Sequence, residues 1–231
     1  FMEYLEFERI LSAKRMQRYK DAANGDTRKA MALYRNNLRL SQEMFTIVSC
    51  FEVALRNAID GLLVTTLGDD WLRDSVQDNG IFSNGRMNET RKIIDKAYSR
   101  LNRQGIYSHS KLIAEMEFGV WKYMFSSLQY RATGQCLLRA FPNKPRSSAA
   151  VQYNNTYIFN ELDKVNSLRN RIAHHEPICF RLHESEIDTS YIINEYQKIQ
   201  TLFSWMGIDS HSMLYGLDHV QSVCAKINSL K

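Results

Sequence analysis

One short polar run carries the residue types in this chain that can do chemistry. Residues 166–178 read NSLRNRIAHHEPI and place within seven residues Arg169, Asn170, Arg171, His174 and His175. On a helix, Asn170 and His174 lie one turn apart on one ridge, and Arg171 and His175 share the neighbouring ridge. The apolar residues between them, Leu168 and Ile172, form a separate stripe. The polar cluster is therefore expected to line a surface or a cleft.

Arginine and histidine together, with no set of carboxylates nearby, suit RNA cleavage by the 2′-hydroxyl group. A base removes the 2′-hydroxyl proton, an acid protonates the departing 5′-oxygen, and a cation stabilises the charged phosphorane. Histidine titrates near neutral pH, and arginine donates two parallel hydrogen bonds to phosphate oxygens. The structural alternative is a helix end whose arginines and histidines cap carbonyl groups and pair with acids. The residues alone leave both interpretations open.

Helices must position this motif, because the chain holds only three prolines and ten glycines in 231 residues. A β-sandwich or barrel of this length needs far more turn residues. The fold class is therefore predicted as all-α, with one long central helix over residues 27–67 and Gly68 as its C-terminal stop. The motif helix is predicted to end at His175, just before Pro177. Helices are expected at about 3–22, 27–67, 86–103, 108–116, 120–130, 133–141, 155–175, 188–206 and 212–229.

Further features of these helices concern packing. In the helix over 86–103, an apolar stripe is expected to pack inward and comprises Met87, Ile93, Ile94, Ala97 and Leu101. The three tryptophans are expected in the core, whereas Tyr107, His109 and Tyr123 are weak candidates for stacking on RNA bases. We find no convincing domain boundary, so residues 1–231 are predicted as a single domain, with the basic helices of 1–40 as a candidate appended element.

The motif resembles a known signature. RNRIAHHEPI, at 169–178, is similar to the Arg-x4–6-His motif of HEPN ribonucleases in its RN-x3-H form, and the HEPI ending is similar to the Abi-like branch, the AbiD/AbiF phage abortive-infection proteins. Two upstream segments are similar to that branch and follow in the same order. They are YRNNLRLS at 34–41 with FEVALRNAI at 51–59, and EFGVW at 117–121. The resemblance spans residues 34–178.

The resemblance implies a HEPN-like helical bundle and a metal-independent endoribonuclease, a toxin-like effector of abortive infection that leaves 2′,3′-cyclic phosphate ends. It implies that Arg169 and His174 are catalytic and that Asn170 supports them. It also implies a homodimer whose cleft combines the motifs of two chains. His175 would position RNA phosphate or cap the helix end, and Arg171 is a further supporting candidate. No cofactor is expected, and adjacent histidines do not converge easily on a metal ion.

Charge is unevenly distributed along the chain, whose formal net charge is +5. Residues 14–39 contain eight basic and two acidic residues, and Arg35 and Arg39 lie within the resembling segment. This stretch is either a solvated helix face or a basic surface that binds RNA phosphates.

A charged ladder follows in the apolar stretch 44–67, where Glu52, Arg56 and Asp60 lie at i, i+4 and i+8. Charges at these positions disfavour a membrane span. The ladder is either a series of intrahelical ion pairs, or it brings Glu52 or Arg56 to the catalytic cleft.

Partners follow from the expected activity. A toxin-like ribonuclease needs restraint, so a neutralising antitoxin, RNA or protein, is expected beside the RNA substrate. Four widely spaced cysteines favour reduced thiols in a cytoplasmic protein. The competing interpretation is a non-catalytic RNA-binding or scaffold module of the same fold. A third is an interaction protein that binds no nucleic acid.

Overall fold

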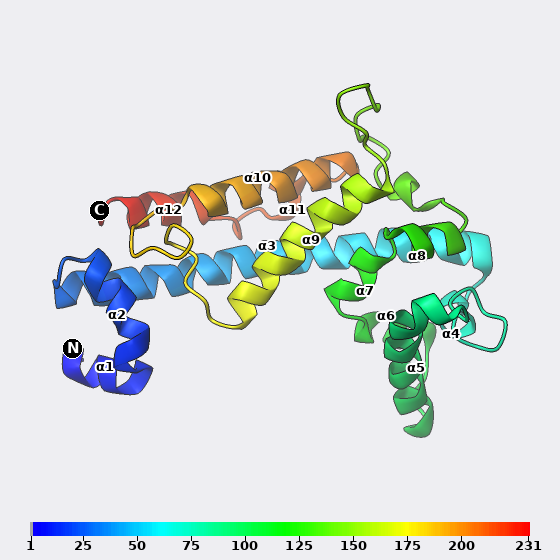
Figure 1. The fold of residues 1–231 in the computed structure, drawn as a ribbon, viewed down its shortest axis with the longest axis horizontal. Coiled ribbons are helices and arrows are strands. Elements are labelled where there is room, and N and C mark those ends of the chain that lie inside the picture. The colour runs from blue at the N-terminus through cyan, green and yellow to red at the C-terminus, as the bar shows by residue number, and fades with distance from the viewer. Residues whose placement is uncertain (1) are drawn as a thin grey trace. The chain divides into compact units, whose positions relative to one another are not determined.

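Figure 1 shows the computed structural model of the chain, which describes residues 2–231 and consists of helices joined by turns and loops. Within this range no β-strand occurs, and Phe180 and Ile187 form an isolated bridge. The prediction of an all-α fold with one long central helix is confirmed. The elements are α1 (Tyr4–Leu11), α2 (Ala13–Ala22), α3 (Thr27–Leu67), α4 (Trp71–Asp74), η1 (Gly85–Met87), α5 (Asn88–Arg103), α6 (His109–Glu115), α7 (Phe118–Tyr123), α8 (Ser127–Ala132), η2 (Leu137–Ala140), α9 (Asn155–Ala173), α10 (Ser190–Trp205), α11 (Ser210–Met213) and α12 (Val220–Asn228).

The helix α3 has the bounds that its sequence predicts. Its buried residues recur at spacings of three and four along its length, as an amphipathic helix requires, and include Leu33, Leu40, Met44, Ile47, Phe51, Leu55, Ile59 and Leu63. It ends at Gly68, whose φ of +102° suits glycine and whose N–H donates to the Val64 carbonyl at 3.0 Å. One long amphipathic stripe therefore organises the packing along the whole helix.

The chain divides into two compact units. The first comprises residues up to Ser49, Ser167–Thr201 and Asp209–Lys231, and the second comprises Cys50–Asn166 and Leu202–Ile208. Three of the four crossings between the units lie inside α3, α9 and α10, and the fourth lies in the loop between α10 and α11. This explains why composition along the sequence shows no boundary. The proposal of a single domain over 1–231 stays a prediction.

The first unit packs α2, the start of α3 and the segment after α9 through aromatic rings. The Tyr19 ring lies 5.1 Å from the rings of both Tyr34 and Phe180, and Phe7 of α1 meets Tyr34 edge-on at 5.5 Å. Tyr19 is almost fully buried, and desolvation raises the pKa of its hydroxyl well above the usual value. This aromatic group fixes the segment that follows the motif against the N-terminal helices.

The second unit has its own aromatic core. The Phe51 ring of α3 packs edge-on against Phe203 at 5.2 Å and lies 6.4 Å from Phe118 of α7. Trp71 and Trp121 are fully buried, as their sequence context predicts. Each unit therefore has buried aromatic side chains of its own.

Several predicted helices are divided in the structure. The helix predicted over 3–22 is interrupted at Ser12, which has a φ of +79° and whose Oγ accepts a hydrogen bond from the Arg15 N–H at 3.3 Å. Serine competes for backbone hydrogen bonds in this way and favours caps over helix interiors. Likewise, the predicted helix over 212–229 is divided by Gly216, whose φ is +73°. Local turn chemistry overrides periodicity at both points.

No described helix is both long and apolar enough to cross a membrane. Cys179 and Cys224 are buried, Cys50 and Cys136 are partly buried, and all four are free thiols in the structure.

Candidate active site

The motif lies where α9 ends, and a specific turn creates that end. The His175 N–H donates to the Ile172 carbonyl at 3.0 Å, and the Glu176 N–H donates to the Arg171 carbonyl at 2.9 Å. This pair of bonds is a Schellman motif, in which His175 takes the left-handed position with a φ of +56°. The helix therefore stops at Ala173, two residues before the predicted end. The terminating element is the left-handed His175, and Pro177 lies one residue beyond the completed turn.

Three contacts hold the segment after this turn in place. The Arg15 Nη1 atom of α2 donates to the His175 carbonyl at 2.8 Å. Arg171 Nη2 donates to the Pro177 carbonyl at 3.1 Å, and the same guanidinium lies 5.1 Å from the centre of the Tyr191 ring. The buried Asn37 side chain of α3 accepts a hydrogen bond from the Ile178 N–H at 2.9 Å. The course of the backbone beyond the helix is thus determined by side chains from α2, α3 and α9.

The three residues that the resemblance implies as catalytic remain available at the surface. His174 keeps the helical register, because its N–H donates to the Asn170 carbonyl at 2.9 Å. Its imidazole is exposed and has no hydrogen-bond partner among residues 2–231. Asn170 is also exposed, and Arg169 is half-buried with one long hydrogen bond of 3.5 Å from Nη1 to the Asn170 Oδ1 atom. The backbone places Asn170 and His174 one turn apart on the same ridge.

The supporting candidates divide into two groups. Arg171 holds the helix end, and its Nε also lies 3.3 Å from the Glu176 carboxylate, so its guanidinium is engaged within the fold. His175 contributes through its backbone conformation and carbonyl, although its side chain is exposed. Arg35 and Arg39 are exposed on α3, and Arg35 lies over the Phe7 ring at 5.2 Å. These two arginines remain accessible to a phosphate.

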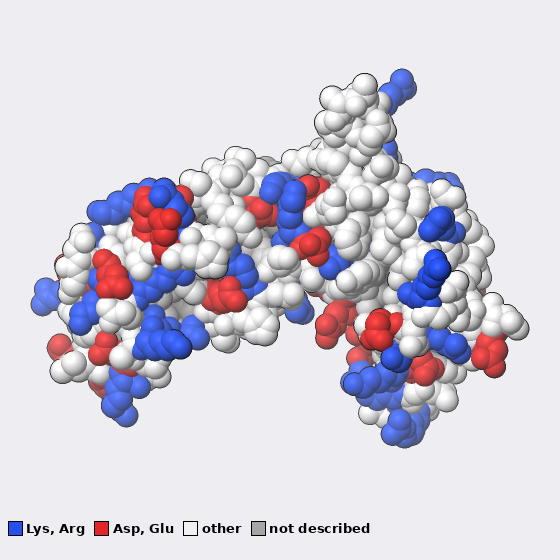
Figure 2. Space-filling model, viewed as in Figure 1, with Lys and Arg blue, Asp and Glu red and all other residues white. Residues whose placement is uncertain are grey.

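The basic stretch 14–39 is used in part by the fold. Arg18 donates to the carbonyls of Arg181 and Glu184 and stacks over the Phe180 ring at 4.7 Å. Arg15 is engaged at the helix end, as described above. The exposed members with no such contact in the described structure include Lys14, Arg28 and Arg39. On the face shown in Figure 2, blue and red side chains alternate over α1 and α2. Over α1 and α2, this face carries no continuous basic patch.

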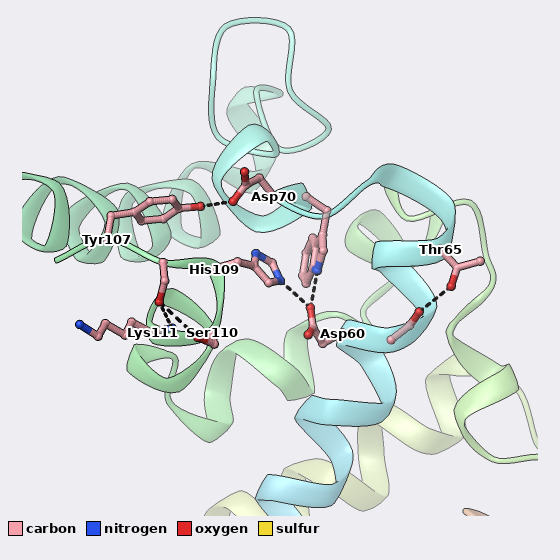
Figure 3. Close-up of polar contacts among 10 residues, drawn as sticks. Asp60, Thr65, Asp70, Tyr107, His109, Ser110 and Lys111 are labelled. Carbon is pink, nitrogen blue, oxygen red and sulfur yellow. Dashed lines mark hydrogen bonds and ion pairs between the residues drawn. The ribbon is translucent and has the colours of Figure 1, made fainter.

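The predicted charged ladder of α3 lies in the second unit, and Figure 3 shows the contacts of its last member, Asp60. Asp60 Oδ1 lies 2.8 Å from His109 Nε2 and accepts a hydrogen bond from the Trp71 indole N–H at 2.7 Å. The Nε atom of Arg56 is buried with no hydrogen-bond partner among residues 2–231. Glu52 is half-buried and engaged in an interaction of its own. The ladder therefore supplies Asp60 to its own unit, and the role of Glu52 or Arg56 in the cleft stays a prediction.

All three weak stacking candidates have structural partners, and the Tyr123 ring lies 5.7 Å from the Phe159 ring and 4.5 Å from the Lys122 ammonium. His109 is held by Asp60, and the Tyr107 hydroxyl donates to the Asp70 carboxylate (Figure 3). This hydrogen bond is the main cause that lowers the pKa of Asp70 below its usual value. Sequence reasoning did not identify the pairs that His109 and Tyr107 form, since their partners lie 49 and 37 residues apart.

Sequence reasoning also missed the positioning roles of Asn37 and Arg15. Asn37 lies inside the YRNNLRLS segment, so the resemblance includes this residue but does not indicate what its side chain does. Arg15 carried no signal beyond its positive charge. Among residues 2–231, no group of three or more His, Cys, Asp or Glu side chains is arranged to hold a metal ion.

Comparison with known proteins gives one match. The profile of the family described as "Abi-like protein" matches residues 2–179, which include α1 to α9 and the whole motif. Comparisons with curated proteins and with solved structures gave no significant match.

Proposed function

The chain belongs to the Abi-like protein family, and from this membership we propose that it is a metal-independent endoribonuclease of the HEPN type that acts in phage abortive infection. The observation that carries the proposal is the state of His174. Its imidazole is exposed, has no hydrogen-bond partner among residues 2–231, and lies one helical turn from Asn170 at a helix end that three contacts hold. An imidazole that the fold does not engage is free to reach a substrate as a general acid or base.

The chemistry proceeds through the 2′-hydroxyl group of the substrate. A neutral imidazole removes the 2′-hydroxyl proton, the 2′-oxygen forms a bond to phosphorus, and the bond to the 5′-oxygen breaks. A protonated imidazole supplies the proton to the departing 5′-oxygen, so the products are a 2′,3′-cyclic phosphate and a 5′-hydroxyl. The guanidinium of Arg169 neutralises the charge that develops on the phosphorane oxygens.

This scheme needs an acid and a base at one phosphate, and each chain supplies His174 once. We therefore propose a homodimer in which two motifs share a cleft. The exposure of Arg169, Asn170 and His174 at the chain surface supports this arrangement, because a second copy can approach them. A neutralising partner, RNA or protein, would act by covering the same surface.

The test compares Arg169→Ala and His174→Ala with His211→Ala, a control that removes an exposed histidine of α11 in the same unit. We expect purified wild type and His211→Ala to cleave RNA equally well in EDTA and to leave cyclic phosphate ends. Each motif variant should lose about 100- to 10,000-fold in rate, the usual contribution of a general acid or base. RNA binding should persist in both.

Three outcomes would overturn the proposal. Equal cleavage by wild type and both motif variants would exclude the motif as the catalytic group. Cleavage that EDTA abolishes would indicate a metal site instead. A wild type that binds RNA without cleaving it would establish the non-catalytic RNA-binding alternative.

A further inference from the structure

The second unit contains a groove that the motif does not use. It has a volume of about 870 Å³ and is lined by residues of η1, α5, α6, α7 and α8, all between Arg86 and Gln129. This volume lies in the range of pockets that bind small ligands or parts of larger ones. Since Arg169 and His174 belong to the first unit, the groove is a separate feature of the chain.

The floor of the groove combines apolar side chains with a fixed amide. Met116 and Val120 are buried beneath it. The Gln129 side chain is only 6% exposed, and its Nε2 donates to the Thr90 Oγ1 atom at 2.9 Å. Ile93, which the sequence predicts to pack inward with the apolar stripe of α5, is instead 48% exposed and lines the groove. A large apolar side chain is thus presented to an incoming ligand.

The rim is mixed in charge, with a small basic excess. Arg86, Lys96 and Arg103 line the groove without an ion-pair partner among residues 2–231. The acidic residues Glu117 and Glu89 line it as well, and Glu89 pairs with Lys92 at 3.0 Å. Arg100 also lines it, but its charge is neutralised by an ion pair with Glu115. In Figure 2, blue side chains gather over α5 at the lower right, among fewer red ones. The groove therefore suits an anionic ligand that also offers apolar surface.

The spacing of these cations favours a strand over a single small anion. Lys96 and Arg103 lie on one face of α5, separated by seven residues, or about 10 Å along the helix axis. At this spacing each cation can neutralise a different phosphate of a nucleic-acid strand. Tyr123, 47% exposed on the wall of the groove, packs against Phe159 and the Lys122 ammonium. The exposed part of its ring offers a surface on which a base can stack.

We propose that this groove binds a single-stranded segment of RNA, with phosphates along Lys96 and Arg103 and a base against Tyr123 and Ile93. The inference rests on the proposed function, because it makes the groove the place where the second unit holds the RNA that the motif cleaves. It also gives Gly119 of the EFGVW segment a physical role. A side chain there would project into space with no atom within 4 Å of its Cβ, on the wall of the groove.

The first experiment removes the two cations. Lys96→Gln with Arg103→Gln is compared with Lys111→Gln and Arg139→Gln, a matched pair of exposed basic residues of the same unit that do not line the groove. Binding is measured with a fluorescent 2′-O-methyl oligoribonucleotide, which no 2′-hydroxyl attack can cleave. We expect on the order of tenfold weaker binding for the groove pair only. For this pair, the slope of the logarithm of the binding constant against the logarithm of the salt concentration should be less steep by about 1.4. Each single-strand phosphate that a cation neutralises contributes about 0.7 to that slope.

The second experiment fills the groove without changing its charge. Gly119→Leu places a branched side chain in the open space. Gly61→Leu is the control, because Gly61 is an exposed glycine of α3 in the same unit that does not line the groove. Neither position has a positive φ or an atom within 4 Å of a new Cβ, so both variants should fold, with a small gain in helix propensity. We expect Gly119→Leu to weaken oligonucleotide binding at least fivefold and Gly61→Leu to leave it within twofold.

The outcomes separate this inference from the proposed function. If oligonucleotide binding is unchanged both in Lys96→Gln with Arg103→Gln and in Gly119→Leu, the groove assignment is overturned, whether or not RNA is cleaved. Equal competition by polyglutamate would identify an acidic protein as the occupant, and equal competition by free nucleoside monophosphates would identify a small-molecule site; either would overturn the inference. Weaker binding by the groove variants, while His174→Ala still binds, supports the groove even if wild type shows no cleavage.

Discussion

Replacing His175 by glycine tests whether this residue acts through its backbone or through its imidazole. The structure places His175 in the left-handed position of the turn that ends α9, with a φ of +56°. A residue with a Cβ is destabilised there by about 1–2 kcal/mol, with histidine at the lower end of this range because it is among the residues that tolerate this region. Glycine removes that cost but loses about 0.5–1 kcal/mol through the greater freedom of the unfolded chain.

The net expectation for His175→Gly is a stabilisation of about 0.5 kcal/mol. A β-branched residue in the same conformation is strongly disfavoured, so His175→Val should lose at least about 1 kcal/mol. The two variants should therefore span roughly 2 kcal/mol of unfolding free energy, which corresponds to about 4–8 °C in Tm for a chain of this size. The hydrogen bond from Arg15 involves the His175 carbonyl and is available in both variants.

Thermal unfolding, followed by circular dichroism, measures the order of stability of His175→Gly, wild type and His175→Val. RNA cleavage is measured on the same samples. His211→Gly is the control, since His211 lies in α11 with an ordinary φ and should lose stability when replaced. We expect His175→Gly to cleave RNA within about threefold of wild type, because its contribution at neutral pH is conformational.

Two results would refute this reasoning. A lower Tm for His175→Gly than for wild type would mean that the left-handed turn does not limit stability at this position. A higher Tm combined with loss of cleavage would show that the imidazole of His175 belongs to the catalytic group.

Three further predictions concern stability and are checked by chemical or thermal unfolding. Gly80→Ala should cost several kcal/mol, since the new Cβ would lie 2.4 Å from two backbone oxygens, whereas Gly119→Ala meets no atom within 4 Å and should be neutral or stabilising. Asp60→Ala should cost about 2–3 kcal/mol because it leaves the Trp71 indole N–H without its acceptor; an unchanged Tm would contradict this. Hydrogen bonds at the start of α10, chiefly from the Ser190 hydroxyl and N–H, hold the pKa of Asp188 below its usual value. The ionised Asp188 carboxylate therefore stabilises the fold above the unfolded pKa of about 3.9, and this stabilisation is lost as pH falls through the folded pKa. In Asp188→Asn, the free energy of unfolding should depend less steeply on pH in that acidic range, and its slope elsewhere should be unchanged.

Periodicity and breakers predicted the long helices well. The bounds of α3 agree with those expected from its apolar spacing and from Gly68, and α6 begins within one residue of the start expected at Ser108. These features depend on residues within one or two turns, which a sequence shows directly. The short elements were predicted less well, because Ser12 and Gly216 take left-handed conformations that interrupt an otherwise helical pattern.

For the candidate site, the sequence by itself predicted which residues would carry the chemistry and that they lie together at the end of a helix. Local spacing places Asn170 and His174 on one ridge, and the family match covers the whole motif. Tertiary structure alone decided which polar residues hold the fold and which stay available. Arg15 is engaged by the His175 carbonyl, 160 residues away, and Asp60 by His109, 49 residues away.

The physical reason is the range of the interactions. Helix periodicity and capping act over a few residues, whereas the groove of the second unit forms only when α5 and α7 pack near each other. Ile93 illustrates the difference, because its spacing matches a buried stripe and only the packed neighbours reveal that its side of the helix is left open. The sequence therefore determined the motif, and the tertiary structure decided the surface beyond it to which RNA is proposed to bind.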